Sequence, residues 1–256
     1  MQRFIVGLAG IAIVVFAFVT WANAQADGLD LDLSTIVASE SPAPSEPASA
    51  EPVQQQQDPE PQVIETEGDA TPAQKALMSL ASVGVTPATR VPAYDRDLFG
   101  SAWADIDGNG CRQRDDVLAR DMTNVTTEDG CKVLTGVLND PYTGTTISFT
   151  FGAKTSQAVQ IDHIHSLSGA WKAGAWAWTA EQRKRFANDF ENLLAVSGKA
   201  NGPKSDKGPA DWMPSTSGNA AYDCTYAIDY THILVKYDLT APAADIAALR
   251  DTLTTC

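Results

Sequence analysis

Residues 25–74 contain eleven acidic side chains and no lysine or arginine, and they limit what the chain can fold into. The segment is also rich in proline, glutamine, serine and alanine, as in SESPAPSEPASAEPVQQQQDPEPQ. It has too few large apolar side chains to offset the entropy lost on folding, and repeated proline favours extended polyproline II stretches. We therefore expect a disordered acidic linker over residues 25–74 and a folded domain over residues 75–256.

The net charge is unevenly distributed between the linker and the domain, and this distribution decides which partners the domain can bind. The 256 residues include 32 acidic and 18 basic side chains, a formal charge of −14, which would argue against binding nucleic acid if it were evenly spread. Without the linker and the single base of residues 1–24, the domain has 21 acids and 17 bases, a net charge of −4. The acidity belongs mainly to the linker, so a nucleic-acid enzyme is not excluded.

The first 24 residues have the pattern of a secretory signal peptide. Arg3 is followed by an apolar run from Phe4 to Trp21 and by the small-x-small ending Ala22-Asn23-Ala24, which predicts cleavage after Ala24. The alternative is an uncleaved anchor, because about 18 apolar residues can just span a bilayer. In either case we expect a secreted or cell-surface protein, with transient membrane or cell-wall association through its N-terminus.

The domain reads as α+β, with short strands and helices in mixed order. VLTGVLND and TTISFTF, joined by PYTG, predict a β-hairpin, and the capping-box pattern of Thr179 and Gln182 predicts the start of a helix. The stretch YAIDYTHILVKY, which contains His232, fits either a strand or a helix. The other expected elements are helices over 71–83, 178–190, 204–212 and 241–256, and strands over 158–165 and 192–197.

Four cysteines in an exported chain predict two disulfides. They are Cys111, Cys131, Cys224 and Cys256, and none lies in a C-x-x-C pair of the kind that binds zinc. Four cysteines allow three pairings. We favour Cys111–Cys131 and Cys224–Cys256, because each pair closes a local loop.

The segment around Asp105 resembles the start of a calcium-binding loop. Asp105, Asp107 and Asn109 occupy positions 1, 3 and 5 of an EF-hand-type pattern, with glycine at position 6 and Asp116 at position 12. The aspartate at position 12 is shorter than the usual bidentate glutamate, and Cys111 occupies position 7. The alternative to a structural Ca²⁺ site is a turn made of Asp, Asn and Gly.

The chemistry of the domain centres on Asp162 and His163 at the end of a predicted strand. A histidine in such a place is more often a structural hydrogen-bonding group than a catalyst. Here, however, the neighbouring carboxylate can bind a hard cation while the histidine activates a water molecule. Asn192 and Asn201 follow downstream, nine residues apart. Together these side chains fit a phosphodiesterase site with one metal ion.

These residues also carry a resemblance to a known family. DHIHSL, NLLAV with Asn192, and Asn201 nine residues later resemble the ββα-metal core of HNH endonucleases. Residues from about 94 to 256 resemble secreted actinobacterial HNH endonuclease-family proteins, which are related to the C-terminal domain of modification-dependent restriction endonucleases. The matching blocks include YDRDLFGSAWADIDGNGC, RDDVLARD, DPYTGTTISF, RFANDFENLLAV and KSDKGPADWMP.

The resemblance implies a role for each of the four residues. His163 is the expected general base, and Asp162 and Asn201 are the expected ligands of a divalent metal, Mg²⁺ or alternatively Mn²⁺. Asn192 is expected to fix the loop that carries the base through backbone hydrogen bonds. Because proline is tolerated in the first turn of a helix, Pro203 predicts that the helix carrying Asn201 begins at about 201–203.

Supporting roles are expected for basic and polar residues nearby. His165 is a candidate for assisting the metal or contacting phosphate, and Lys204, Lys207 and Arg185 are candidates for binding phosphate. We expect a DNA endonuclease of low sequence specificity that uses no organic cofactor. The alternatives are a catalytically silent cell-surface binding module on an HNH scaffold and a phosphodiesterase that acts on RNA. The sequence does not indicate an oligomeric state.

Overall fold

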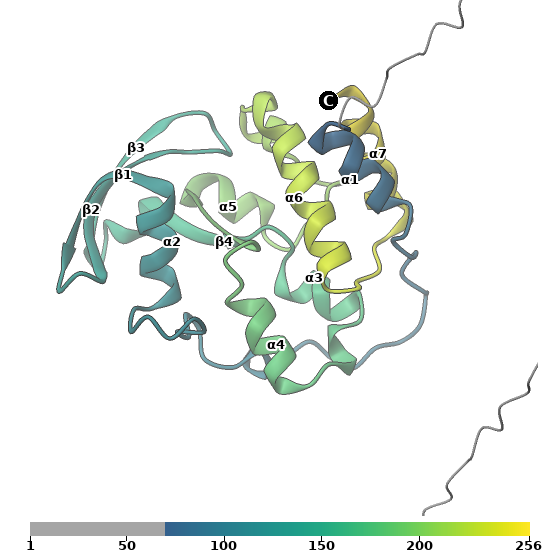
Figure 1. Ribbon diagram of the computed structural model, residues 1–256, viewed down its shortest axis with the longest axis horizontal. Coiled ribbons are helices and arrows are strands. Elements are labelled where there is room, and N and C mark those ends of the chain that lie inside the picture. The colour runs from purple at the N-terminus through teal and green to yellow at the C-terminus, as the bar shows by residue number, and fades with distance from the viewer. Residues whose placement is uncertain (1–69) are drawn as a thin grey trace, which may run out of the picture. The chain divides into compact units, whose positions relative to one another are not determined.

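A computed structural model describes residues 70–256, so the predicted signal peptide and nearly all of the predicted linker lie outside the described residues. The domain is α+β, as expected (Figure 1). Its strands are β1 (Met122–Glu128), β2 (Lys132–Asn139), β3 (Thr146–Thr150), β4 (Val159–His163) and β5 (Leu193–Ser197). Its α-helices are α1 (Pro72–Leu80), α2 (Gln113–Asp121), α3 (Leu167–Lys172), α4 (Ala180–Ala187), α5 (Gly198–Lys204), α6 (Asp223–Lys236) and α7 (Ala243–Thr255). Its 3-10 turns are η1 (Arg96–Phe99), η2 (Ser156–Ala158), η3 (Ala175–Ala177), η4 (Pro214–Ser217) and η5 (Ala220–Tyr222).

Helix α4 begins where the capping box predicted it. The Thr179 hydroxyl accepts a hydrogen bond from the Gln182 amide at 3.2 Å, and Gln182 Oε1 accepts one from the Thr179 amide at 2.9 Å. Thr71 and Gln74 form the same arrangement at the start of α1. Each capping box provides acceptors for two backbone amides at the start of the helix, where no acceptor within the helix is available.

The three-stranded antiparallel sheet has the order β1-β2-β3. The predicted hairpin is confirmed, since β2 pairs with β3 from Thr135 opposite Thr150 to Asn139 opposite Thr146. The sequence did not predict α2 or β1. β1 has the sequence MTNVTTE and is mostly exposed, so it lacks the alternation of apolar and polar residues that marks a half-buried strand.

Strands β4 and β5 form a separate antiparallel pair, with His163 opposite Leu193 and Asp162 opposite Leu194. The chain passes directly from β5 into α5, which completes a strand–strand–helix unit of the predicted ββα type. Two details of the prediction are wrong: α5 begins at Gly198 rather than at 201–203, and residues 205–212 form turns rather than a helix. Pro203 lies in the last turn of this seven-residue helix, where it removes only one backbone hydrogen bond.

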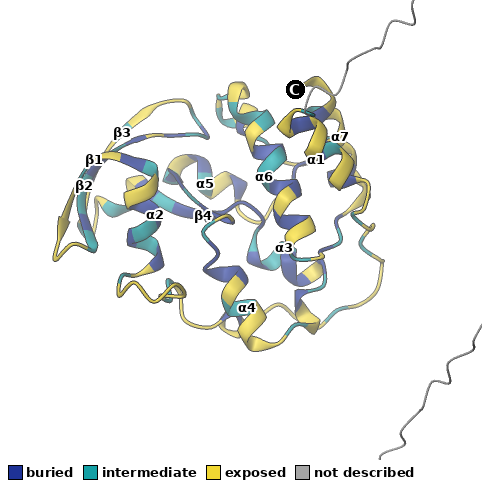
Figure 2. Cartoon of the chain, in the orientation of Figure 1, coloured by how far each residue is buried: buried dark blue, intermediate teal, exposed yellow. Residues whose placement is uncertain are grey.

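Two apolar clusters hold these elements together, and Figure 2 shows the buried segments meeting between the sheets and the helices. One cluster lies between α2, the three-stranded sheet and one face of the β4–β5 pair, and it includes Leu118, Phe149 and Ile161. The larger cluster is formed mainly by α1, α3, α6 and α7 with aromatic residues such as Phe186 and Tyr226. The β4–β5 pair therefore contacts both clusters, and the end of β4 is held in a rigid setting.

Both predicted disulfide pairings are confirmed. Cys111 bonds to Cys131 with a Cα–Cα distance of 5.2 Å, and Cys224 bonds to Cys256 with a Cα–Cα distance of 5.8 Å. The second bond ties the start of α6 to the end of the chain. Within residues 70–256, no helix has the length and apolar character needed to cross a membrane.

Candidate active site

Asp162 and His163 are the last two residues of β4, and different parts of the fold hold their side chains. Asp162 Oδ2 accepts hydrogen bonds from the Tyr142 hydroxyl at 2.6 Å and pairs with the Lys204 ammonium at 2.8 Å. The other carboxylate oxygen, Oδ1, makes no hydrogen bond with any described residue. Asp162 is thus anchored through one oxygen, and the other is available.

The His163 ring is held by Ala187 and Trp103. Its Nε2 lies 2.8 Å from the Ala187 carbonyl oxygen, and its ring is stacked on Trp103 with centroids 6.4 Å apart and an angle of 17° between the planes. Because a carbonyl only accepts, Nε2 carries the proton, which leaves the lone pair on Nδ1. Burial lowers the pKa of His163 to about 4, and the positive charges of Arg96 and Lys204 act in the same direction. The imidazole is therefore neutral at pH 7.

Asn192 fixes the backbone that follows the histidine. Its Oδ1 accepts a hydrogen bond from the His165 amide at 2.9 Å, and its Nδ2 donates one to the His165 carbonyl at 3.2 Å. Its own carbonyl accepts from the Ile164 amide at 2.8 Å, and the side chain is fully buried. These bonds hold the chain where β4 ends, directly after His163.

Asn201 lies on α5 and is oriented by β4. Its Nδ2 donates a hydrogen bond to Gln160 Oε1 at 2.9 Å, so its Oδ1 is left to accept or to ligate. Asp162, His163 and Asn201 all line one open cleft of about 610 Å³, together with Arg96, Tyr94 and Asp206. The structure thus brings three of the four predicted site residues to the same cleft, with Asn192 buried behind it.

The oxygen atoms left free in this cleft suit a hard divalent cation. Asp162 Oδ1 and Asn201 Oδ1 are a carboxylate and an amide oxygen, the donors that Mg²⁺ and Mn²⁺ prefer. Among residues 70–256, no group of three His, Cys, Asp or Glu side chains is placed to hold a metal ion. Any cation here would therefore take its remaining ligands from water or substrate, as Mg²⁺ commonly does.

Arg96 is a residue of the cleft that sequence reasoning missed. It lies in the short turn η1, is exposed, and forms no ion pair within the described part of the chain. Arg96 lies within the family-matching block YDRDLFGSAWADIDGNGC, but nothing in that block marks it as a site residue, because an exposed turn far upstream shows no register with β4. Its place beside His163 depends on tertiary packing, namely the contacts of η1 with α3 and α4.

The expected supporting residues are distributed differently. His165 lies beyond the end of β4 and is buried against Tyr230, with ring centroids 4.9 Å apart, so it does not line the cleft. The Lys204 side chain is fully buried against Asp162 rather than open to a phosphate. Lys207 is exposed but does not line the cleft, and Arg185 pairs with Glu181 at 3.5 Å on another surface.

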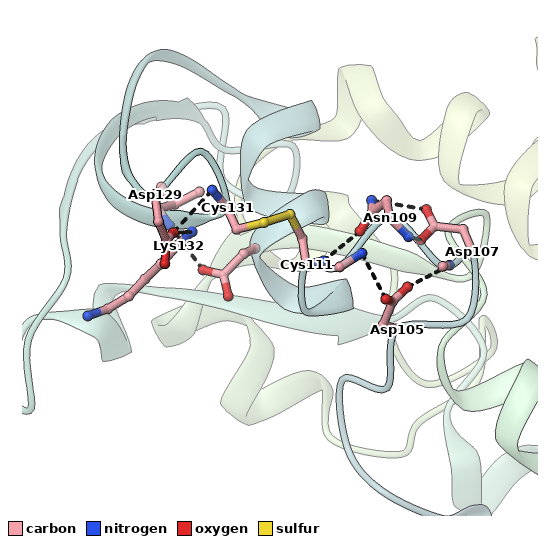
Figure 3. Close-up of a disulfide and its surroundings, with 11 residues drawn as sticks. Asp105, Asp107, Asn109, Cys111, Asp129, Cys131 and Lys132 are labelled. Carbon is pink, nitrogen blue, oxygen red and sulfur yellow. Dashed lines mark hydrogen bonds between the residues drawn. A yellow bond between two sulfur atoms is a disulfide. The ribbon is translucent and has the colours of Figure 1, made fainter.

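The calcium-like loop is held by its own backbone (Figure 3). Asp105 accepts hydrogen bonds from the Gly108 amide at 2.7 Å and the Gly110 amide at 2.9 Å, and Asn109 Oδ1 accepts from the Cys111 amide at 2.7 Å. Such bonds are typical of Asx turns. Asp116 lies near enough to Asp105 and Asp107 for their charges to add to the effect of burial in raising its pKa. The Ca²⁺ site stays a prediction.

Known proteins match most of this domain. The model of the family described as GmrSD restriction endonucleases, C-terminal domain, matches residues 112–251, which include Asp162, His163, Asn192 and Asn201. An uncharacterized secreted protein of Arthroderma benhamiae is 36% identical over 198 residues, covering 77% of this chain and 92% of that protein. No solved structure gives a significant match.

Proposed function

Because the chain belongs to the family of GmrSD restriction endonuclease C-terminal domains, as its sequence resemblance predicted, we propose that it is a metal-dependent endonuclease that hydrolyses DNA phosphodiester bonds. The relative from Arthroderma benhamiae is a secreted protein by name. Together with the signal-like first 24 residues, this supports a role outside the cytoplasm. Low sequence specificity is part of the proposal, because no segment of the sequence resembles a base-reading recognition helix.

One observation carries the proposal: a buried, neutral histidine shares a cleft with two free oxygen donors. In the proposed reaction, His163 Nδ1 takes the proton from the attacking water, while the hydrogen bond from Nε2 to the Ala187 carbonyl holds the ring in the required tautomer. Asn192 keeps the backbone around the histidine in place through its two bonds to His165. The base therefore meets the substrate with its orientation already fixed.

Asp162 and Asn201 would hold the metal ion through their free Oδ1 atoms. A bound divalent cation supplies positive charge that stabilises the phosphate and the leaving 3′ oxygen in the transition state. Lys204 and Tyr142 fix the other Asp162 oxygen, so the carboxylate cannot rotate away from the cleft without losing both partners. Gln160 orients the Asn201 amide in the same way.

Plasmid digestion tests the proposal directly. Purified protein would be incubated with supercoiled plasmid in Mg²⁺, Mn²⁺, Ca²⁺ or EDTA, beside the variants His163→Ala and His232→Ala. We expect nicking and linearisation with Mg²⁺ or Mn²⁺, none in EDTA, and a loss of about 10³-fold in His163→Ala. His232 is exposed and pairs with Glu191, so its replacement is the matched control and should leave cleavage unchanged.

An intact plasmid under every metal condition would refute the proposal, and so would equal rates for the wild type and His163→Ala. Single-stranded RNA and single-stranded DNA of the same sequence belong in the same experiment. Cleavage of RNA alone would keep the hydrolytic mechanism and replace the substrate.

A further inference from the structure

A second groove adjoins the His163 cleft and carries only positive charge. It has a volume of about 610 Å³ and is lined by residues from β3, from the η2 region and from the start of α5. Its charged lining residues are Lys154 and Lys199, and no acidic side chain lines it. Both lysines are exposed, and neither forms an ion pair with any residue between 70 and 256.

The cleft and the groove are neighbours, because a hydrogen bond joins one lining residue of each. Gln160 lines the second groove and Asn201 lines the His163 cleft, and these side chains are joined at 2.9 Å. A long ligand that fills the cleft can therefore continue past Asn201 into the groove.

The charges of the His163 cleft are balanced except at one place. Asp162 is paired with the buried Lys204, and Asp206 is paired with Lys172 at 3.4 Å. Arg96 has no such partner in the described chain. Both acidic side chains of the cleft are thus paired, and unpaired positive charge remains at Arg96 in the cleft and at Lys154 and Lys199 in the groove.

We propose that one nucleic-acid strand occupies both hollows, with Arg96 on a phosphate in the His163 cleft and Lys154 and Lys199 on phosphates of neighbouring nucleotides. This inference rests on the proposed function and extends it to the path of the substrate. An extended polyanion matches a connected pair of hollows whose only uncompensated charges are positive. The guanidinium of Arg96 can hold two oxygens of one phosphate, whereas the lysines act as point charges along the backbone.

Salt-dependent binding tests the path. A labelled DNA duplex of about 20 base pairs would be titrated with full-length His163→Ala protein by fluorescence anisotropy over a range of salt concentrations. Each lost phosphate contact reduces the slope of log K against log salt by about 0.9. Adding Arg96→Gln should therefore reduce the slope by about 0.9, and adding Lys154→Gln with Lys199→Gln by about 1.8. Lys75→Gln with Arg250→Gln, exposed residues on α1 and α7, removes the same charge elsewhere and should leave the slope unchanged.

The outcomes separate this inference from the proposed function. If wild-type protein cleaves DNA but the groove variants keep the full slope, the path is wrong and the nuclease stands. Equal reductions in the groove variants and in the control pair would also overturn the path, because they would report only net charge. If wild-type protein neither cleaves nor binds DNA or RNA, both proposals fail.

Discussion

The ammonium of Lys204 lies 2.8 Å from Asp162 Oδ2, with the lysine side chain fully buried and the aspartate side chain 7% exposed. The same ammonium donates to the His163 carbonyl at 3.0 Å and lies 5.9 Å from the centre of the Trp212 ring. The last residue of α5 therefore ties that helix to the end of β4. Lys204 was expected to bind phosphate, but it is buried and stabilises the site through Asp162 and the His163 carbonyl.

Replacing Lys204 with methionine should destabilise the protein strongly. Removing one partner of a buried ion pair leaves an uncompensated charge and costs about 3–5 kcal/mol. The free energy of unfolding, measured with urea, should fall by this amount. Asp162→Asn combined with Lys204→Met should cost less than the sum of the two single changes, because neither partner is then left charged and unpaired.

Lys132→Met is the matched control for this experiment. It breaks the exposed pair between Lys132 and Glu128, and surface pairs contribute little to stability. Similar losses for Lys204→Met and Lys132→Met would contradict the structural role assigned to the buried pair.

Asn192→Ala should lower both stability and cleavage. The change removes two buried hydrogen bonds to His165 and leaves a buried amide and carbonyl without partners, at a cost of about 2–4 kcal/mol. Since these bonds fix the chain after His163, kcat should fall more than the folded fraction does. Circular dichroism at the assay temperature gives the folded fraction. A variant that is fully folded and cleaves at the wild-type rate would show that Asn192 does not position the base.

The candidate site residues that the sequence indicated lie close together along the chain. Asp162 and His163 are adjacent, Asn192 directly precedes β5 and Asn201 follows it on α5, and the resemblance to the HNH core indicated all four. The block that contains Arg96 and Trp103 was part of the resemblance, but their places beside His163 could not be predicted, because turns and loops without periodicity bring them there. The predicted start of α5 was wrong because Pro203 lies in the last turn of a seven-residue helix rather than in its first turn, and there it removes only one backbone hydrogen bond.

Acid should destabilise the fold through His165. Burial against Tyr230 and Phe186 lowers its pKa to about 4, from an ordinary value of 6.5. The folded pKa lies below the unfolded one, so the stabilisation is fully present above about pH 6.5 and is lost as the pH falls towards 4. This difference corresponds to about 3 kcal/mol. His165→Phe should therefore reduce the fall in unfolding free energy between about pH 7 and pH 4.5.

His163 shares the lowered pKa, so part of the acid sensitivity should persist in His165→Phe. An unchanged profile in His165→Phe would mean that other groups cause the acid sensitivity.

The two disulfides should differ in their effect on cleavage. Cys224–Cys256 spans 32 residues and Cys111–Cys131 spans 20, so the loss of either should cost about 3–4 kcal/mol by the chain-entropy model. Only Cys111–Cys131 anchors the loop that follows Trp103, the residue stacked on the His163 ring. Replacing Cys111 and Cys131 with serine should therefore also reduce kcat, whereas the same change at Cys224 and Cys256 should leave kcat close to wild type below the melting temperature. Thermal unfolding and plasmid cleavage of the two double variants measure both effects, and equal kcat values would show that the loop does not act on His163.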